Sequence, residues 1–207
     1  GDNYSNILIL KADHTGEQMW RKDYAYSSSD RVNMVIELED GSLVMAGSLI
    51  SNTNSSKDLL ILKTGSDGNI EWQTSYGDTR DEIANSIGIT SDGGFIITGE
   101  ITNKNTGNSS CYVLKVNNNG EFEWDRSFGG SLNDQGFSLV PANDGGFVIT
   151  GVTRSQSDSS GDLWLFKVNN AGDMLWEKTF GGINFEAGRS LQQTSDNGYI
   201  IVGQTES

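Results

Sequence analysis

Residues 58–102 read DLLILKTGSDGNIEWQTSYGDTRDEIANSIGITSDGGFIITGEIT, and this stretch decides the fold. Segment 58–63 is apolar between charged ends, and segment 69–76 alternates apolar and polar side chains, as β-strands do. Segment 82–90 follows, and segment 94–99 is a β-branched apolar run typical of a strand buried on both faces. Glycine-bearing turns separate these segments, because glycine adopts positive φ without steric cost. The stretch therefore predicts four short β-strands.

The same pattern occurs four times in the chain without insertion or deletion. Residues 20 and 72 are both tryptophan, which sets the period at 72 − 20 = 52 residues. A tryptophan repeated in this way is expected to pack between neighbouring sheets. A lysine is also repeated, and in each copy it ends the strand that corresponds to segment 58–63. The two structural sets are Trp20, Trp72, Trp124 and Trp176, and Lys11, Lys63, Lys115 and Lys167.

Four strands in each repeat of 40 to 50 residues are the sequence signature of a β-propeller blade. We predict one all-β domain over residues 1–207, a propeller of four four-stranded blades. The blades would span about 41–92, 93–144, 145–196, and 197–207 with 1–40, so that strands from both termini close the last blade. A stacked solenoid fits less well, since its end repeats need polar caps and the end copies here are apolar. Half of an eight-bladed dimer and a fragment of a longer propeller remain alternatives to a closed monomer.

The composition excludes several classes of function. The formal net charge is −14, and so acidic a surface repels phosphate backbones and anionic lipid. We therefore expect no nucleic-acid partner. No apolar run reaches the ~18 residues that span a bilayer, so we expect no membrane insertion. The chain carries no signal peptide and starts at Gly1, which predicts a mature or trimmed form.

The repeat resembles those of secreted, mostly uncharacterised bacterial and archaeal β-propeller proteins. The shared pattern is D-x-W-L-x-K-x-N-x-x-G-x-x-x-W-x-x-x-F-G-G, present at 162–182, followed by S-x-x-x-T-x-D-G-G-F-I-I-T-G-x-T, present at 86–102 apart from Ile101 before the final threonine. The resemblance implies an extracellular or cell-surface location and is nearly silent on activity. A looser likeness to quinoprotein blades implies a redox domain as a minor alternative, although those enzymes use larger rings.

An acidic residue opens the fourth strand of every copy. A ring of such carboxylates would gather Ca²⁺ or another cation, or a polar ligand, if the four met near an axis. More often such an acid accepts backbone N–H bonds within its own loop or pairs with a lysine. Apart from this set we expect no metal site and no cofactor. The set is Asp30, Glu82, Asp134 and Glu186, and we call it the acidic position.

No catalytic set emerges from the motifs. His14 is the only histidine, so a two-histidine metal site is excluded, and Cys111 is the only cysteine, so no intrachain disulfide forms. Cys111 takes the place of an aliphatic residue in the other copies, which predicts a small buried apolar side chain. An enzyme is therefore the less favoured class of protein. Two carboxylates that are close only in space would not be visible in the sequence, so a carboxylate-based enzyme stays an alternative.

The loops at 48–57, 100–109 and 152–161 differ between copies and are rich in Ser, Asn and Thr. Variable polar loops on a rigid scaffold are where recognition usually lies. The sequence thus favours an extracellular, non-enzymatic binding or scaffold module that presents these loops to a protein or a glycan. A carboxylate-based hydrolase or lyase acting on glycans is the alternative.

Overall fold

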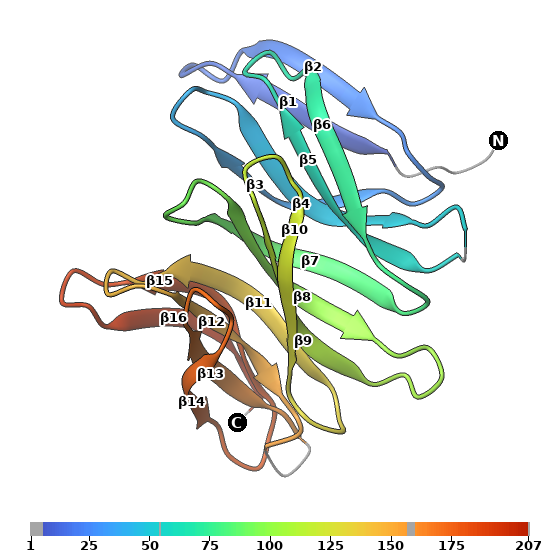
Figure 1. Ribbon diagram of the computed structural model, residues 1–207. Coiled ribbons are helices and arrows are strands. Elements are labelled where there is room, and N and C mark those ends of the chain that lie inside the picture. Colours follow the sequence, from blue (N-terminus) through green and yellow to red (C-terminus); the bar gives the residue numbers. More distant parts are fainter. Residues whose placement is uncertain (1–5, 54, 157–159, 207) are drawn as a thin grey trace. The chain divides into compact units, whose positions relative to one another are not determined.

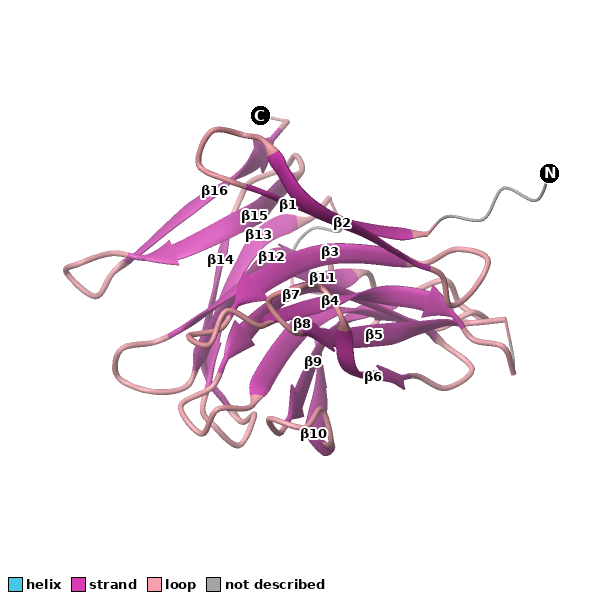
Figure 2. Ribbon diagram, turned by 90° about the horizontal axis from the view of Figure 1, so that it is seen from above, coloured by secondary structure: helices cyan, strands magenta, loops and turns pink. Residues whose placement is uncertain are grey.

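The computed structural model describes residues 6–53, 55–156 and 160–206, and every regular element within them is a β-strand (Figures 1 and 2). The all-β prediction is confirmed, and the four segments quoted first fall in β5, β6, β7 and β8. In chain order the strands are β1 (Ile7–Ala12), β2 (Gln18–Tyr24), β3 (Arg31–Glu37), β4 (Leu43–Ile50), β5 (Lys57–Thr64), β6 (Ile70–Tyr76), β7 (Asp81–Ile89), β8 (Phe95–Thr102), β9 (Ser109–Val116), β10 (Phe122–Phe128), β11 (Asp134–Pro141), β12 (Phe147–Thr153), β13 (Asp162–Val168), β14 (Met174–Phe180), β15 (Glu186–Gln193) and β16 (Tyr199–Thr205).

The strands form antiparallel sheets of four, as predicted, but the predicted grouping is shifted by one strand. The sheets are β3-β4-β5-β6, β7-β8-β9-β10 and β11-β12-β13-β14, with β1-β2 and β15-β16 as two-stranded sheets. The strands of residues 31–76 therefore form one sheet. The boundaries predicted from the sequence, 41–92, were wrong, because they would have placed β4, β5, β6 and β7 in one sheet. The union of the two terminal hairpins into one further blade stays a prediction.

Tight turns explain the shift. The β7–β8 connection is a hairpin in which Thr90 N–H donates to Gly94 O at 2.9 Å, and Gly93 takes a φ of +81° that L side chains rarely adopt. Asn197 holds the matching place before β16 with a φ of 65°. This hairpin pairs the strand that follows each acidic position with the next strand of the chain. The β6–β7 connection has no such turn, and it leads from one sheet to the next.

A repeated glycine in the second strand of each sheet is explained by a bulge. Opposite Gly151 the register of β11 shifts between Gly136 and Ser138. The shift brings Gln135 O to 1.8 Å from the point where a Cβ on Gly151 would lie. Gly47 faces the carbonyl of Arg31 at the same distance. No larger residue fits, because a side-chain carbon cannot approach a carbonyl oxygen so closely.

The chain divides into two compact units, Gly1–Ala84 and Asn85–Ser207. In the first unit the β1-β2 hairpin packs on the β3–β6 sheet. Its core comprises Ile7, Tyr24, Met45, Leu60 and Leu62. The hydroxyl of Tyr24 donates to the carbonyl of Gly68, so the hairpin is joined to the β5–β6 turn as well as packed on the sheet.

In the second unit the sheets pack face to face, β11 against β8 and β9, and β15 against β11 to β13. Trp164 and Phe166 are fully buried between the first two sheets, with ring centroids 4.4 Å apart, and Phe128 lies 5.1 Å from Phe166. Burial of such large apolar side chains is the main stabilising contribution in this unit, worth roughly 2–3 kcal/mol for each.

Candidate functional site

The four acids of the acidic position lie at equivalent places, within one residue of the start of β3, β7, β11 and β15. Asp30, Glu82 and Asp134 are buried, each at most 2% exposed, and Glu186 is half-buried. A buried carboxylate without partners is costly, so the partners of each acid reveal what it does.

Asp134 binds two loops at once. Its Oδ2 accepts a hydrogen bond at 2.8 Å from the N–H of Gly130, in the loop before β11. The same carboxylate accepts from the hydroxyls of Thr153 and Ser155 at 2.6 Å, and from the N–H of Arg154 at 3.1 Å, all at the end of β12. The acid therefore joins the β10–β11 loop to the β12–β13 loop.

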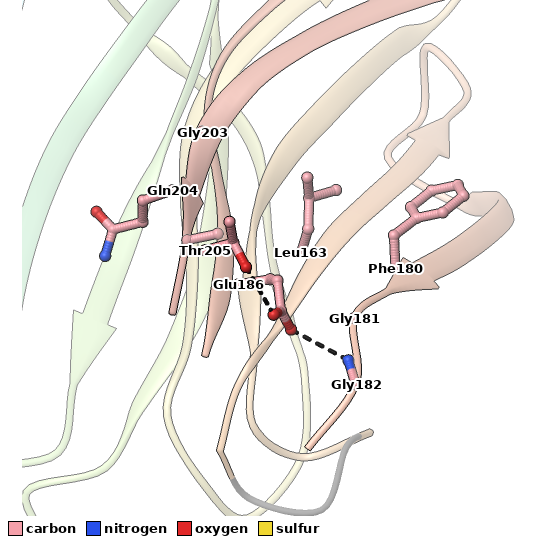
Figure 3. Close-up of a pocket in the computed structure, with 9 residues that line it drawn as sticks. Leu163, Phe180, Gly181, Gly182, Glu186, Gly203, Gln204 and Thr205 are labelled. Carbon is pink, nitrogen blue, oxygen red and sulfur yellow. Dashed lines mark hydrogen bonds between the residues drawn. The ribbon is translucent and has the colours of Figure 1, made fainter. Parts of the chain in front are cut away.

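Asp30 and Glu186 act in the same way with fewer partners. Asp30 accepts from the N–H groups of Tyr26 and Ser27, at 2.5 and 3.0 Å. Glu186 Oε2 accepts from Gly182 N–H at 3.1 Å, and its Oε1 accepts from the Thr205 hydroxyl at 3.0 Å, as Figure 3 shows.

A pocket of about 560 Å³ adjoins Glu186 (Figure 3). Its apolar side chains are Leu163, Phe180 and Ala187, and Glu186 is its single charged residue among the described lining residues. Both oxygens of that carboxylate already accept hydrogen bonds. The pocket thus presents an apolar surface beside one acid that is already hydrogen-bonded.

Glu82 also accepts a backbone hydrogen bond within its own loop, from Asp78, but one of its oxygens sets it apart from the other three acids. Its Oε2 is buried and has no hydrogen-bond partner among the described residues. Burial, together with the charges of Asp78 and Asp58, raises the pKa of Glu82 to about 7. The nearest cation is the Nε of Arg80, 3.9 Å from Glu82 Oε1, and that guanidinium is already paired with Asp78 at 2.7 Å.

The repeated lysines each form an ion pair. Lys115 is 3% exposed, and its Nζ lies 2.7 Å from Glu123 Oε2 and 3.0 Å from Asp92 Oδ2. Burial by itself lowers the pKa of Lys115, but its hydrogen bonds to these two carboxylates outweigh burial and raise the pKa. Lys11, Lys63 and Lys167 pair with Glu37, Glu71 and Asp144. These contacts assign the lysines to holding the ends of strands.

The repeated tryptophans lie on the outer strand of each sheet, half-buried. The ring of Trp124 sits 2.7 Å from where a Cβ of Gly172 would be, and its Nε1–H donates to Asn170 O at 3.2 Å. Trp20 packs on Gly68 in the same way. Each of these two indoles thus covers the β-turn of the following sheet.

Cys111 and His14 show no arrangement that would make them reactive. Cys111 is fully buried, and burial raises the pKa of its thiol to about 12, while its sulfur lies 3.7 Å from the Thr98 hydroxyl. His14 is exposed in the β1–β2 turn. Across residues 6–53, 55–156 and 160–206, no three His, Cys, Asp or Glu side chains converge in a way that could hold a metal ion. The same residues contain no helix long and apolar enough to cross a bilayer.

The polar loops predicted to be variable are the β4–β5, β8–β9 and β12–β13 connections. Residue 54 and residues 157–159, which fall within the first and third, lie outside the described residues. The β8–β9 loop is held internally, since Asn103 Oδ1 accepts from the N–H groups of Asn105 and Thr106 at 2.9 and 3.3 Å. Asn133, in the later β10–β11 loop, accepts from Ser109 N–H at 2.9 Å and so braces the far end of the β8–β9 loop.

One residue that matters for the site was missed from the sequence. Asp58 is the second residue of β5, and its carboxylate lies beside that of Glu82 over Gly77. The sequence does contain a pattern that points to Asp58. The two copies with glutamate at the acidic position also have aspartate 24 residues earlier (82 − 58 = 24), at Asp58 and Asp162.

A scan of the chain against known protein-family models gives no match, and a search of curated proteins finds none of significant similarity.

Proposed function

We propose that this protein is an extracellular, non-enzymatic binding or scaffold module that recognises a protein or glycan through the loops at one end of its strands. The observation that carries the proposal is the role of Asp134. Its carboxylate joins two of these loops by accepting hydrogen bonds from Gly130, Thr153 and Ser155. An acid so occupied stiffens a surface and is unavailable as a general base.

The loops themselves support recognition. Their side chains are mostly hydroxyls and amides, which donate to and accept from the polar groups of glycans and protein surfaces. A hydrogen bond from Ser51 N–H to Ser56 O, at 2.7 Å, ties together the two ends of the β4–β5 loop before any partner arrives. Preorganised loops lose less conformational entropy on binding, which favours affinity.

A carboxylate-based hydrolase or lyase is less well supported. Such an enzyme needs an acid and a base on either side of a substrate in an open pocket. The pocket beside Glu186 has one carboxylate among its described lining residues, and each of its oxygens already accepts a hydrogen bond. Asp162, the second acid beside Gly181, is not among those lining residues.

The experiment replaces residues 103–108 with Asn-Gly. Thr102 and Ser109 are direct partners across the strands, so a two-residue turn can close the same hairpin. The matched control changes Asn118→Ser and Asn119→Asp in the turn at the other end of β9. Both proteins are tested on an array of glycans and a panel of secreted proteins.

We expect wild type and control to bind one or more members of the array and the loop variant to lose at least about tenfold in affinity, or roughly 1.4 kcal/mol. A loop variant that keeps every interaction, or a wild type that binds nothing in either panel, would refute the proposal.

A further inference from the structure

Two of the four copies build a pair of carboxylates where the other two have only one. Asp58 precedes Glu82, and Asp162 precedes Glu186, at the same separation. In the other copies the earlier place holds Asn6 or Ser110, and the acidic position then holds the shorter aspartate. The length of the acid thus follows the presence of a second carboxylate, which indicates that the two side chains act together.

The first pair converges on Gly77. Asp58 Oδ1 lies 2.4 Å, and Glu82 Oε2 lies 2.7 Å, from the place where a Cβ of Gly77 would be, so the two oxygens are at most 5.1 Å apart, the sum of these distances. Any side chain at residue 77 would occupy that space. Glycine therefore keeps open a small space lined by two carboxylates.

The pair lacks a hydroxyl donor that two of the other copies have. Glu186 receives a hydrogen bond from Thr205, and Asp134 receives one from the equivalent Thr153. The matching residue for Glu82 is Ile101, which has no polar group to offer. Glu82 is 2% exposed, and its Oε2 has no partner among the described residues. A buried acceptor in that state costs about 1–3 kcal/mol unless a bound species satisfies it.

The surrounding charges favour a cation. Asp78, in the loop before β7, forms a two-point pair with Arg80, at 2.7 and 3.1 Å, and this hydrogen bonding lowers the pKa of Asp78 to about 2. Glu82 thus lies near the charges of Asp78 and Asp58, while the Arg80 guanidinium, 3.9 Å from Glu82, is already paired with Asp78. Further oxygens are close, since Ser56 Oγ lies 2.7 Å from the Asp78 carbonyl and 3.3 Å from Asp58 Oδ1.

We propose that Asp58 and Glu82 hold a calcium ion over Gly77. Carboxylate, carbonyl and hydroxyl oxygens are the ligands that Ca²⁺ takes, and its flexible coordination lets water complete the shell. Two carboxylates with a carbonyl, a hydroxyl and water make a weak site, in keeping with the absence of a third converging acid among the described residues. The ion would join the start of β5 to the start of β7 and so hold one end of the first unit together. This proposal does not depend on the binding function proposed above.

The test measures thermal unfolding of the whole protein at pH 8 after EDTA treatment, with millimolar CaCl₂, MgCl₂, or KCl of matched ionic strength. We expect Ca²⁺ to raise the midpoint by about 3 °C or more and KCl to leave it unchanged. Calorimetric titration with CaCl₂ should give one ion per chain. Asp58→Asn and Glu82→Gln should each weaken binding at least about tenfold, whereas the exposed Glu39→Gln keeps it.

The proposal is overturned if Ca²⁺ shifts the midpoint no more than KCl does. It is also overturned if both variants keep the shift, since binding would then lie elsewhere. Stability that depends on pH but not on Ca²⁺ would show that the pair takes up a proton instead. Should Glu82→Gln fail to fold, titration of Asp58→Asn still decides the question.

Discussion

The buried carboxyl of Glu82 should make the stability of this protein depend on pH in an unusual direction. Its pKa is about 7 in the folded chain, against 4.5 for an ordinary glutamate. Because the folded pKa is the higher one, the folded state binds the proton more tightly than the unfolded state does. The resulting stability is fully present below about pH 4.5 and is lost as the pH rises through 7.

The size of the effect follows from the two pKa values. Each pKa unit corresponds to about 1.4 kcal/mol, so ionising Glu82 in place should cost roughly 3 kcal/mol by pH 8.5. Glu82→Gln mimics the protonated acid and removes this cost. We expect the variant to match wild type near pH 4.5 and to exceed its free energy of unfolding by up to roughly 3 kcal/mol at pH 8.5.

Urea unfolding followed by tryptophan fluorescence, in EDTA and at several pH values from 4.5 to 8.5, measures this difference. The Glu39→Gln control changes an exposed glutamate and should track wild type at every pH. A difference between Glu82→Gln and wild type that stays constant over this range would refute the reasoning, because it would mean that Glu82 does not titrate there in the folded protein.

Three further outcomes follow from single contacts. Gly151→Ala should cost at least about 3 kcal/mol, because its Cβ would meet Gln135 O at 1.8 Å, whereas Gly182→Ala, with nothing within 4 Å, should be close to neutral; equal effects in urea unfolding would contradict the bulge explanation. Asp134→Asn should destabilise the protein by about 2–4 kcal/mol and speed hydrogen exchange at the end of β12 and in the loop before β11, and unchanged exchange there would show that the acid does not hold the loops. Cys111 should resist thiol reagents until the protein unfolds, so modification of the native chain at the rate of the urea-unfolded chain would disprove its burial.

The acidic position shows how far sequence reasoning reached toward the site. The spacing of the four acids marked them as equivalent. Two structural arrangements were weighed for them, bonding within the acid's own loop and pairing with a lysine, and the first describes Asp30, Asp134 and Glu186. The proximity of Asp58 to Glu82 was not foreseen. The two are 24 residues apart (82 − 58 = 24) and lie in different sheets, and no local pattern links their side chains.

The sequence by itself determined the period, the four strands in each repeat and the turns between them. These depend on alternation, β-branched runs and glycine at positive φ, which are properties of neighbouring residues. The tertiary structure alone decided which strands share a sheet. A repeat has a period, but the sequence does not show where each unit begins, so 41–92 and 31–76 are equally acceptable as one sheet. The choice depends on the hairpin between β7 and β8 and on the β6–β7 connection, which leads from one sheet to the next. The tertiary structure also decided why Gly151 must be glycine and why a side chain at residue 77 would meet two carboxylates, because only packing brings a carbonyl to one and a carboxylate pair to the other.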